Sequence, residues 1–487
     1  MMVLEKLLEQ IPWLRVSGDL HRTVRNLHYD SRRVAEGDAF IAVRGFATDG
    51  HRFLQSAYQK GARVFFVEEP VEMPDSTVVQ LANTRLGMMQ VARALYQFPD
   101  RKLKLIGITG TNGKTTTAFL IQQILKSAGW KPGLLTTIAY QAGEEMIPAE
   151  RTTPESVDLI RLFSEMARNG KNSAVMEVSS HALALNRVAG LKYTAGIFTN
   201  LGRDHLDFHQ TEENYYRAKR QLFESLDQNS VAVLNMDDRR FNDLCAHTEA
   251  DVFSYSINNQ QAGVWCKRYF PTAAGIQMSV QTPYGEMVVS SSLLGKHNAS
   301  NILAAIATAL GLGIHPDKIA TGIQELKAVP GRCEVFQSPE GWTAYVDYAH
   351  TPDALRQILK AVQEAQPAQL RVVFGAGGNR DAGKRPLMGR AAADFADEII
   401  LTNDNPRDED PLEIIRQIQE GISSDTKVDI IPDRREAIRE ALRRCKKGDA
   451  VVIAGKGHEP YQEISGNRHH FSDREEIEKY LQKQKIK

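Results

Sequence analysis

The sequence contains few cysteines, no net charge and no long apolar segment. Its 487 residues include four cysteines at widely separated positions, without a C-x-x-C pair. This spacing argues against a disulfide framework and against a zinc knuckle. Lysine plus arginine number 60, and so do aspartate plus glutamate. No overall field therefore attracts nucleic acid or an anionic membrane, and an anionic ligand must be held by local groups.

Two further absences concern membranes and export. A spanning helix needs about 18 consecutive apolar residues, and no such stretch occurs. The longest candidate, residues 302–314, contains Gly311 and Gly313 and predicts a buried helix. The N-terminus carries Glu5 and Lys6 where a signal peptide requires an apolar run. We therefore expect a cytoplasmic protein that acts without membrane insertion and without a nucleic-acid partner.

The composition and length indicate a soluble α/β protein of several domains. Hydrophobic residues make up 42% and charged residues 25% of the sequence, as in ordinary globular proteins. At about 150 residues per domain, the length predicts roughly three domains. We place them at residues 1–100, 101–332 and 333–487.

The first block, residues 1–100, is expected to be a small α/β domain. A helix is predicted over 84–96, and residues 99–102 have the composition of a polar linker. The apolar runs that predict strands lie at 39–43, 63–67 and 77–81.

The second block, residues 101–332, alternates strands with helices and predicts a parallel sheet. It opens with a strand at 103–108, a glycine-rich turn and a helix at 114–128. Its further strands are predicted at 173–178, 194–199 and 231–235.

The third block, residues 333–487, predicts a second, Rossmann-like doubly wound domain. Its strands are expected at 343–346, 371–374, 398–401, 428–431 and 450–453. In such sheets ligands bind beyond the carboxyl ends of the strands. Polar or glycine-rich clusters follow four of these strands, at 347–350, 375–380, 404–407 and 455–459. Four clusters at one edge predict a binding site.

The strongest local motif is a phosphate-binding loop at Gly107–Thr117. Its glycines let backbone N–H groups converge on phosphate oxygens, and the helix N-terminus adds positive potential. Lys114 can reach the β- and γ-phosphates, and the Thr115 hydroxyl can ligate Mg²⁺. The usual motif has glycine where this chain has Ile108. A glycine-rich turn with an incidental lysine is the alternative, but strand, turn and helix fall where the motif requires them.

Glu177 ends the strand predicted at 173–178. A parallel neighbour would place this carboxylate near Thr115, where a Mg²⁺ ligand belongs. A carboxylate capping the following helix is an equally good interpretation from spacing alone.

A histidine- and aspartate-rich segment, residues 200–209, follows another strand. Beside a phosphate loop, His205 is expected to ligate a metal. His209 is expected to be a solvated loop residue, and His469 and His470 are expected at the surface. Lys219 would ordinarily be interpreted as a lysine on a helix surface.

Six motifs together resemble the Mur ligases, ATP-dependent enzymes that build the peptidoglycan stem peptide. They occur in the family's order, at Gly110–Thr116, Glu177–His181, Asp204–Asp207, Gly295–Asn301, Pro330–Arg332 and Asp347–His350. A residue other than glycine at position 108 is itself part of the family's pattern. Three further stretches, Tyr29–Arg32, Arg151–Pro154 and Asp404–Arg407, narrow the resemblance to a member that adds the third amino acid.

The resemblance implies an activity and its substrates. ATP would convert the D-glutamyl γ-carboxylate of UDP-MurNAc-L-Ala-D-Glu into an acyl phosphate, which the amine of meso-diaminopimelate would attack. The implied cofactor is Mg²⁺, ATP is a co-substrate, and a monomer is expected. An L-lysine-adding Mur ligase is one alternative. Folylpolyglutamate synthetase, which lacks the N-terminal uridine-binding block, is another, and a P-loop motor or regulatory NTPase is a third.

The resemblance also implies residue roles, by position. The catalytic residues would be Lys114, Glu177, His205 and Lys219. The metal ligands would be Thr115, Glu177, His205 and a carbamylated Lys219, which overturns the interpretation of Lys219 as a surface residue. ATP would be bound by Gly110, Thr111, Asn112, Gly113, Lys114, Thr115, Thr116, Asn298, Asn301, Arg332 and Asp347. The UDP-MurNAc-dipeptide would be bound by Tyr29, Ser31, Thr152, Thr153, Ser179 and Arg187. Diaminopimelate would be bound by Arg380, Asp404, Asn405, Pro406, Arg407, Gly455 and Glu459.

Overall fold

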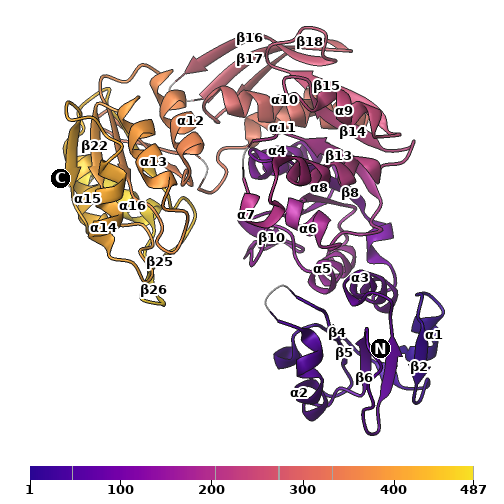
Figure 1. Ribbon diagram of the computed structural model, residues 1–487. Coiled ribbons are helices and arrows are strands. Elements are labelled where there is room, and N and C mark those ends of the chain that lie inside the picture. Colours follow the sequence, from indigo (N-terminus) through magenta and orange to yellow (C-terminus); the bar gives the residue numbers. More distant parts are fainter. Residues whose placement is uncertain (46–47, 203, 273–274, 332, 486–487) are drawn as a thin grey trace. The chain divides into compact units, whose positions relative to one another are not determined.

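The computed structural model describes residues 1–45, 48–202, 204–272, 275–331 and 333–485 (Figure 1). Contacts within the chain divide it into two units. The first contains residues 1–263 and 304–319, and the second contains 264–303 and 320–487. The domain boundaries expected at residues 100 and 332 stay predictions.

A five-stranded sheet organises the N-terminal part of the first unit. Its strands, in spatial order, are β2 (Arg15–Ser17), β7 (Thr77–Gln80), β6 (Val64–Val67), β5 (Ala39–Ile41) and β4 (Leu27–His28). All neighbours are parallel except β2 and β7. The helices are α1 (Leu4–Leu8), α2 (Leu54–Gln59) and α3 (Thr84–Leu95), and β1 (Met2–Val3) pairs with β3 (Thr23–Val24). The strands and the helix predicted in this block are confirmed.

The prediction of a polar linker at residues 99–102 is wrong. Residues Pro99–Lys102 form a short 3₁₀ helix in which Asp100 is only 4% exposed. Arg93 of α3 donates to the Asp100 carboxylate at 2.8 Å. Because this ion pair lets the segment pack against α3, it is not a solvated linker.

A mostly parallel sheet forms the core of the first unit's central part. In spatial order its strands here are β11 (Ile147–Pro148), β10 (Ala139–Gln141), β9 (Pro132–Leu135), β12 (Ser173–Glu177), β8 (Lys104–Thr109), β13 (Tyr193–Phe198), β14 (Val231–Asn235) and β15 (Asp251–Ser256). The pairings from β9 to β15 are parallel. The helices are α4 (Lys114–Ser127), α5 (Ser156–Arg168), α6 (Ser180–Ala184), α7 (Leu206–His209), α8 (Glu212–Glu224) and α9 (Phe241–Ala246). The α/β fold expected for this block is confirmed.

The buried helix expected near residues 302–314 is α10 (Lys296–Gly311), followed by α11 (Pro316–Glu325). Ile302 to Ala307 are fully buried, as their apolar composition requires. The described residues include no helix that is both long and apolar enough to span a membrane.

The second unit contains an antiparallel segment and a mainly parallel sheet. The antiparallel strands are β16 (Val264–Thr272), β17 (Gly275–Thr282) and β18 (Gly285–Ser291). The other sheet has the order β19 (Glu334–Gln337), β20 (Thr343–Asp347), β24 (Ala450–Ala454), β21 (Leu370–Phe374), β22 (Glu398–Leu401) and β23 (Lys427–Ile430). Only β19 is antiparallel to its neighbour. A hairpin of β25 (Tyr461–Ile464) and β26 (Asn467–His470) follows β24.

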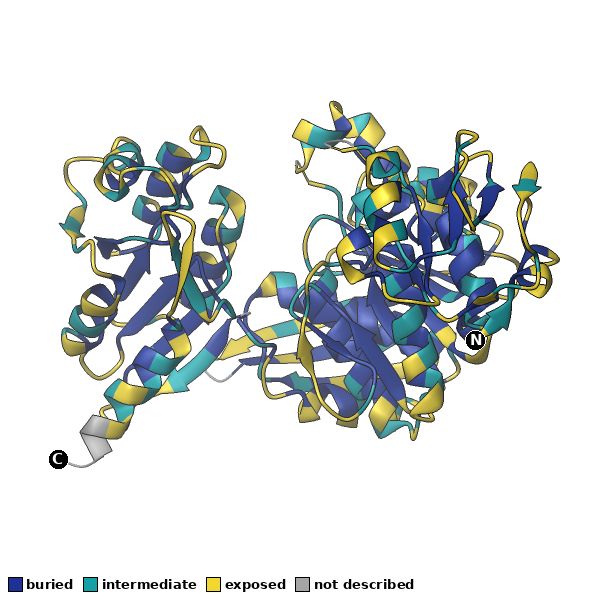
Figure 2. Cartoon of the chain, turned by 90° about the horizontal axis from the view of Figure 1, so that it is seen from below, coloured by how far each residue is buried: buried dark blue, intermediate teal, exposed yellow. Residues whose placement is uncertain are grey.

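Helices cover both faces of this parallel sheet, so it is doubly wound as predicted. Apolar side chains of α12 (Pro352–Gln363), α13 (Lys384–Ala393) and α14 (Pro411–Gln419) pack on one face. Those of α15 (Arg434–Arg443) and α16 (Asp473–Lys485) pack on the other. Figure 2 shows the central strands in dark blue between helices that carry yellow, exposed residues. Strands buried on both faces read as continuous apolar runs, which is why the sequence reveals them.

Candidate active site

The phosphate-binding loop connects β8 to α4 at the centre of the first unit's parallel sheet. Gly110 has φ +149° and Gly113, which directly precedes α4, has φ +85°. A Cβ at Gly110 would lie 1.9 Å from Thr199 Oγ1, so only glycine fits at this position. The turn leads directly into the N-terminus of α4, and a helix N-terminus is an anion-binding arrangement. The predicted strand, turn and helix are confirmed.

The loop is fastened to the strand beside it. Thr199 donates to the carbonyl of Asn112 at 2.6 Å, and the Asn112 N–H donates to Asn200 Oδ1 at 3.0 Å. Lys114 Nζ donates to the carbonyls of Gly110 and Thr111, at 3.0 and 2.8 Å, so the ammonium group lies over its own loop. This arrangement presets a cation where phosphate oxygens would bind.

Glu177 lies beside the loop, as the sequence predicts. It ends β12, which is parallel to β8, and it is 1% exposed. Thr115 Oγ1 donates to its carboxylate at 2.7 Å, and the Thr137 N–H donates to the same oxygen at 2.9 Å. The helix-capping alternative is wrong, because Ser179 caps α6 by accepting from the Ala182 N–H at 3.2 Å.

Lys219 is not a surface lysine. It lies on α8, is 1% exposed, and its Nζ donates to the Gly110 carbonyl at 2.7 Å. The same amine lies 4.3 Å from the centre of the Tyr215 ring. Burial, assisted by the nearby charge of Lys114, lowers the pKa of Lys219 well below its ordinary value. A helix from elsewhere in the sequence thus brings a buried amine to the phosphate loop.

Three histidines gather next to this amine. His205 precedes α7 with a left-handed φ of +52°, and its ring lies 4.7 Å from that of His181. His209 is 6% exposed, and its Nε2 lies 3.0 Å from Ser180 Oγ. The expectation that His209 is solvated is therefore wrong, because α7 folds its ring against α6. His469 and His470 are exposed on β26, as expected.

Oxygen donors at the loop suit a hard cation. Thr115 and Glu177 place a hydroxyl and a carboxylate side by side, which is the ligand chemistry that Mg²⁺ prefers. Among the described residues, no group of three or more His, Cys, Asp or Glu side chains is arranged to hold a metal ion. The chain's own side chains therefore fit a Mg²⁺ that keeps other ligands, such as water and phosphate oxygens.

Four of the predicted substrate residues lie around the end of β12. Thr153 Oγ1 donates to the carbonyl of Glu177 at 2.9 Å and accepts from the Ser179 N–H at 3.0 Å. Arg187 donates to the Thr153 carbonyl at 3.2 Å. Thr152 Oγ1 accepts from the Thr137 hydroxyl at 3.1 Å. These contacts bring the Arg151–Pro154 stretch to the edge that carries the phosphate loop.

Tyr29 and Ser31 lie in the N-terminal part of the first unit. The Tyr29 hydroxyl donates to Asp158 of α5 at 2.6 Å. Tyr29 lines a cavity of about 240 Å³ together with Arg33 and Arg151. Ser31 is buried in the 3₁₀ helix Ser31–Arg33 and is not among the residues lining this cavity.

In the second unit the four polar clusters meet at one edge, as predicted. They follow β20, β24, β21 and β22, which are adjacent and parallel. Asn405 Nδ2 donates to Glu459 at 2.9 Å, and Lys456 Nζ donates to Asn405 Oδ1 at 2.9 Å. Sequence reasoning missed Lys456, which is fully buried and lies 3.3 Å from the Glu459 carboxylate. The lysine in Gly455–Glu459 could have been considered, because it lies between two residues expected in the site.

Arg407 is held in place rather than solvated. It has a left-handed φ of +51°, and its Nη1 donates to the Gly378 carbonyl at 2.7 Å. Its Nε donates to the Glu463 carboxylate at 3.2 Å. A Cβ at Gly378 would lie 1.9 Å from the Pro406 carbonyl oxygen, so the two loops approach closely only because residue 378 is glycine.

The remaining residues expected to contact diaminopimelate differ in exposure. Arg380 is exposed, whereas Asp404 is 8% exposed. A Cβ at Gly455 would lie 2.5 Å from Asp404 Oδ2, so this close approach also depends on glycine.

The residues expected to contact adenine and ribose are buried or hydrogen-bonded within the second unit. Asn298 and Asn301 lie one turn apart on α10 and bond to each other at 2.9 Å. Asp347 ends β20 and accepts from the Cys333 and Ala349 N–H groups, at 2.7 and 2.8 Å. Arg332 lies outside the described residues.

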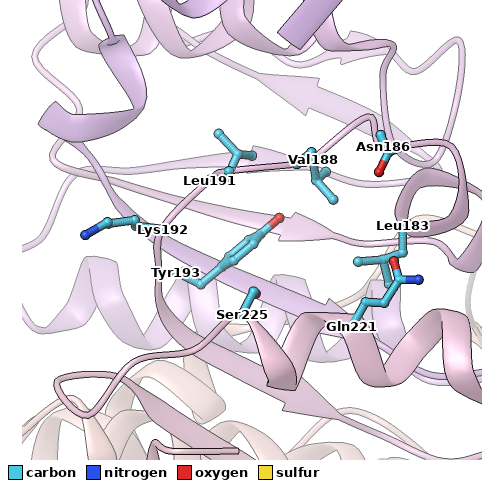
Figure 3. A pocket seen from close by; sticks show the side chains of 10 residues that line it. Leu183, Asn186, Val188, Leu191, Lys192, Tyr193, Gln221 and Ser225 are labelled. Atoms are coloured by element: carbon cyan, nitrogen blue, oxygen red, sulfur yellow. The ribbon is translucent and has the colours of Figure 1, made fainter. Parts of the chain in front are cut away.

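A separate pocket of about 390 Å³ lies near the other end of β13 (Figure 3). Gln221 of α8 and Ser225, which directly follows this helix, contribute to its wall, with Leu191, Lys192 and Tyr193. None of the predicted site residues lines it, so it is distinct from the phosphate loop.

Family models place the chain among known enzymes. The Mur ligase family catalytic domain matches residues 23–98, the Mur ligase middle domain matches 108–309, and the Mur ligase glutamate ligase domain matches 331–457. The chain belongs to the Mur ligase family.

Individual relatives are similar over their full length. The UDP-N-acetylmuramoyl-L-alanyl-D-glutamate–2,6-diaminopimelate ligase of Clostridium tetani is 40% identical over 99% of both chains. A solved structure with the same enzyme name has a TM-score of 0.72 and 33% identity, and the match covers 99% of each chain. The folylpolyglutamate synthase of Mycobacterium tuberculosis, solved with ADP and AMPPCP, has a TM-score of 0.63 at 18% identity. That match covers 76% of this chain and 92% of the synthase, and it shows a shared fold.

Proposed function

We propose that this chain is an ATP-dependent ligase that joins meso-2,6-diaminopimelate to the D-glutamyl γ-carboxylate of UDP-MurNAc-L-Ala-D-Glu. This reaction extends a peptidoglycan precursor. The observation that carries the proposal is the phosphate loop with Glu177 hydrogen-bonded to Thr115, in a chain similar throughout to ligases of that name. We further propose a monomer in the cytoplasm, where ATP is available.

ATP binding is the first role of the loop. The loop shaped by Gly110 and Gly113, together with the N-terminus of α4, would hold the phosphates, with Lys114 neutralising their charge. Thr111, Asn112 and Thr116 belong to the same loop and helix start. Asn298, Asn301, Arg332 and Asp347 are proposed to bind the adenine, ribose and phosphates on the basis of the resemblance.

Thr115 and Glu177 are proposed to hold one Mg²⁺ at the ATP phosphates, and His205 and a carbamylated Lys219 to hold a second. The second ion would offset negative charge where the carboxylate meets the γ-phosphate. Carbamylation converts the Lys219 amine into a carbamate anion, whose oxygens suit a hard cation. This amine is buried, and it donates a hydrogen bond to the Gly110 carbonyl at 2.7 Å, which supports a role at the loop.

The chemistry proceeds in two displacements. An oxygen of the substrate carboxylate attacks the γ-phosphorus of ATP, the bond to the β-phosphate oxygen breaks, and ADP leaves. The amine of diaminopimelate then attacks the acyl carbon, loses a proton, and expels inorganic phosphate. Because two anions must meet in the first step, cations such as Lys114 carry much of the catalysis.

The substrates would be held by separate groups of residues. Thr152, Thr153, Ser179 and Arg187 lie around the end of β12, which suits the muramoyl-peptide end. Tyr29 and Ser31 are proposed to contact the uridine end. Arg380, Asp404, Asn405, Pro406, Arg407, Gly455 and Glu459 are proposed to bind diaminopimelate.

The fixed cation favours diaminopimelate over L-lysine. Diaminopimelate carries a carboxylate beside its distal amine, and Arg407 offers a planar fork of donors for such a group. Lysine would leave the remaining donors of this guanidinium without a ligand carboxylate, and unpaired polar groups in such sites discriminate by on the order of 10⁴-fold. Glu459 is available to accept the distal ammonium through the oxygen that does not face Asn405.

The test combines ATP turnover with product identification. The full chain is incubated with ATP, Mg²⁺, UDP-MurNAc-L-Ala-D-Glu and meso-diaminopimelate, omitting each substrate in turn. Phosphate release should require both the nucleotide-sugar peptide and diaminopimelate, and mass spectrometry should detect the tripeptide product. Lys114→Ala should lose on the order of a hundredfold or more in rate. ATP turnover that is indifferent to both substrates, or equal use of lysine, would contradict the proposal.

A further inference from the structure

We propose that Glu463 is a positioning residue that sets the preference for an amino acid with a distal carboxylate, because it holds the Arg407 guanidinium in a fixed orientation. The inference rests on the proposed function and concerns a residue outside the predicted site. It is carried by the hairpin β25–β26, which the sequence did not reveal.

The hairpin is bonded directly to the loop that carries Arg407. The Glu463 N–H donates to Asn405 Oδ1 at 2.9 Å, and the Arg407 N–H donates to the Glu463 carbonyl at 3.1 Å. The Ser465 N–H donates to the Arg407 carbonyl at 2.8 Å. These backbone bonds fix the positions of Arg407 and Glu463 relative to each other. Their side chains are therefore held next to each other by the backbone.

Two acceptors hold the guanidinium on two sides. The Glu463 carboxylate accepts from Nε at 3.2 Å, and the Gly378 carbonyl accepts from Nη1 at 2.7 Å. A guanidinium has five N–H donors in a planar fork. The described part of the chain supplies no acceptor for Nη2, so Nη2 keeps its donors for a ligand, and Nη1 keeps the hydrogen that does not face Gly378. A carboxylate can accept from these donors.

The geometry indicates that Glu463 positions the Arg407 guanidinium and does not compete with a ligand carboxylate for it. Glu463 contacts Arg407 through the Nε side, whereas an internal carboxylate that blocked the site would occupy the outer edge. Both side chains are about one-fifth exposed, at 22% and 23%. A guanidinium that is oriented before the substrate arrives loses less conformational freedom on binding, which favours affinity. Glu459, another carboxylate in the site, is already bonded to Asn405 and Lys456.

Kinetics of the full chain test the inference. Wild type is measured first with meso-diaminopimelate and L-lysine; absence of diaminopimelate activity there would refute the proposed function itself. Glu463→Ala should raise the KM for diaminopimelate about tenfold, in line with a lost hydrogen bond to a charged group. Its kcat and its KM for ATP should stay near wild type, and the ratio of kcat/KM for diaminopimelate over lysine should fall. Glu463→Gln, which keeps an acceptor oxygen, should restore most of that ratio.

Two controls separate positioning from structural damage. Gln462 fastens the same hairpin by donating to the Asp404 carbonyl at 2.8 Å, so Gln462→Ala should leave the diaminopimelate-to-lysine ratio unchanged. In an Arg407→Ala background, Glu463→Ala should have no further effect on the ratio, because the residue acts through Arg407. An undiminished effect in that background, or the same loss in Gln462→Ala, would overturn the inference.

Discussion

Replacing Thr115 by valine isolates one hydroxyl group at the phosphate loop. The side chain is 5% exposed, and its Oγ1 donates to Glu177 at 2.7 Å. Valine has nearly the same shape without the hydroxyl. Losing a hydrogen bond to a buried charged group costs about 1.5–3 kcal/mol. This corresponds to roughly 10- to 150-fold in an equilibrium constant.

The expected result is an increase of that size in the Mg²⁺ concentration for half-maximal activity and in the KM for ATP. The assay is steady-state phosphate release at saturating peptide and amino-acid substrates over a Mg²⁺ titration. Thr115→Ser keeps the hydroxyl and should remain within about threefold of wild type, a difference of under 1 kcal/mol. Circular dichroism and thermal unfolding would exclude misfolding of each variant.

Thr137 provides a matched control on the same carboxylate. Its hydroxyl lies 3.1 Å from Glu177 Oε2, while its N–H donates to Oε1 at 2.9 Å and survives substitution. Thr137→Val therefore removes a hydroxyl near Glu177 without touching the loop. Equal Mg²⁺ dependence in the two valine variants would mean that Thr115 only orients Glu177, and wild-type dependence in Thr115→Val would refute the reasoning.

Three further changes have expected outcomes. Gly378→Ala places a Cβ 1.9 Å from the Pro406 carbonyl and should raise the KM for diaminopimelate at least several-fold, with ADP binding unchanged by calorimetry. Lys219→Met should abolish ligase activity without lowering the midpoint of thermal unfolding, because burial lowers the amine's pKa and its charge therefore adds no stability. Although burial opposes it, hydrogen bonds to Lys427 and two arginines lower the pKa of Glu398 to about 2. This carboxylate therefore stabilises the fold above its ordinary pKa and loses that effect as the pH falls toward 2. Glu398→Gln should reduce the free energy of unfolding at pH 7 by about 3 kcal/mol, and urea titrations should show the deficit shrinking below pH 4.5; a constant deficit would contradict the assignment.

The strands that carry the sites were predictable because they are buried on both faces. β14 and β22 have the residue limits that the sequence predicts, and β8, β12 and β13 differ by about one residue at their ends. The sequence does not predict the hairpin β25–β26, because its strands are short, β26 is exposed, β25 is only partly buried, and neither has an apolar run to detect. The strands β16 to β18 are antiparallel and partly exposed, which weakens their pattern in the same way.

In the candidate site, too, some residues can be predicted from the local sequence and others cannot. The phosphate loop is contiguous in sequence, so its glycines, Lys114 and Thr115 could be recognised locally. The position of Lys219 could not, because its burial results from α8 packing over a loop 109 residues earlier in the chain. The prediction for His209 is wrong for a related reason, since its exposure depends on the contact between α7 and α6.

The residues proposed to bind ATP and those proposed to select the amino acid differ in how far apart they lie in the sequence. ATP would be bound largely by a local motif, whereas the groups proposed to select the amino acid are pairs from distant segments. Asn405 and Glu459 are 54 residues apart, and Arg407 and Glu463 are 56 apart. Each pair is joined through the segment that follows β24. A substitution at Arg407 alone would leave the Glu463 carboxylate without its cation and the Gly378 carbonyl without its donor, so it would remove one preference without creating another. A new amino-acid preference therefore requires coordinated changes in the loop after β22 and in the hairpin that fastens it.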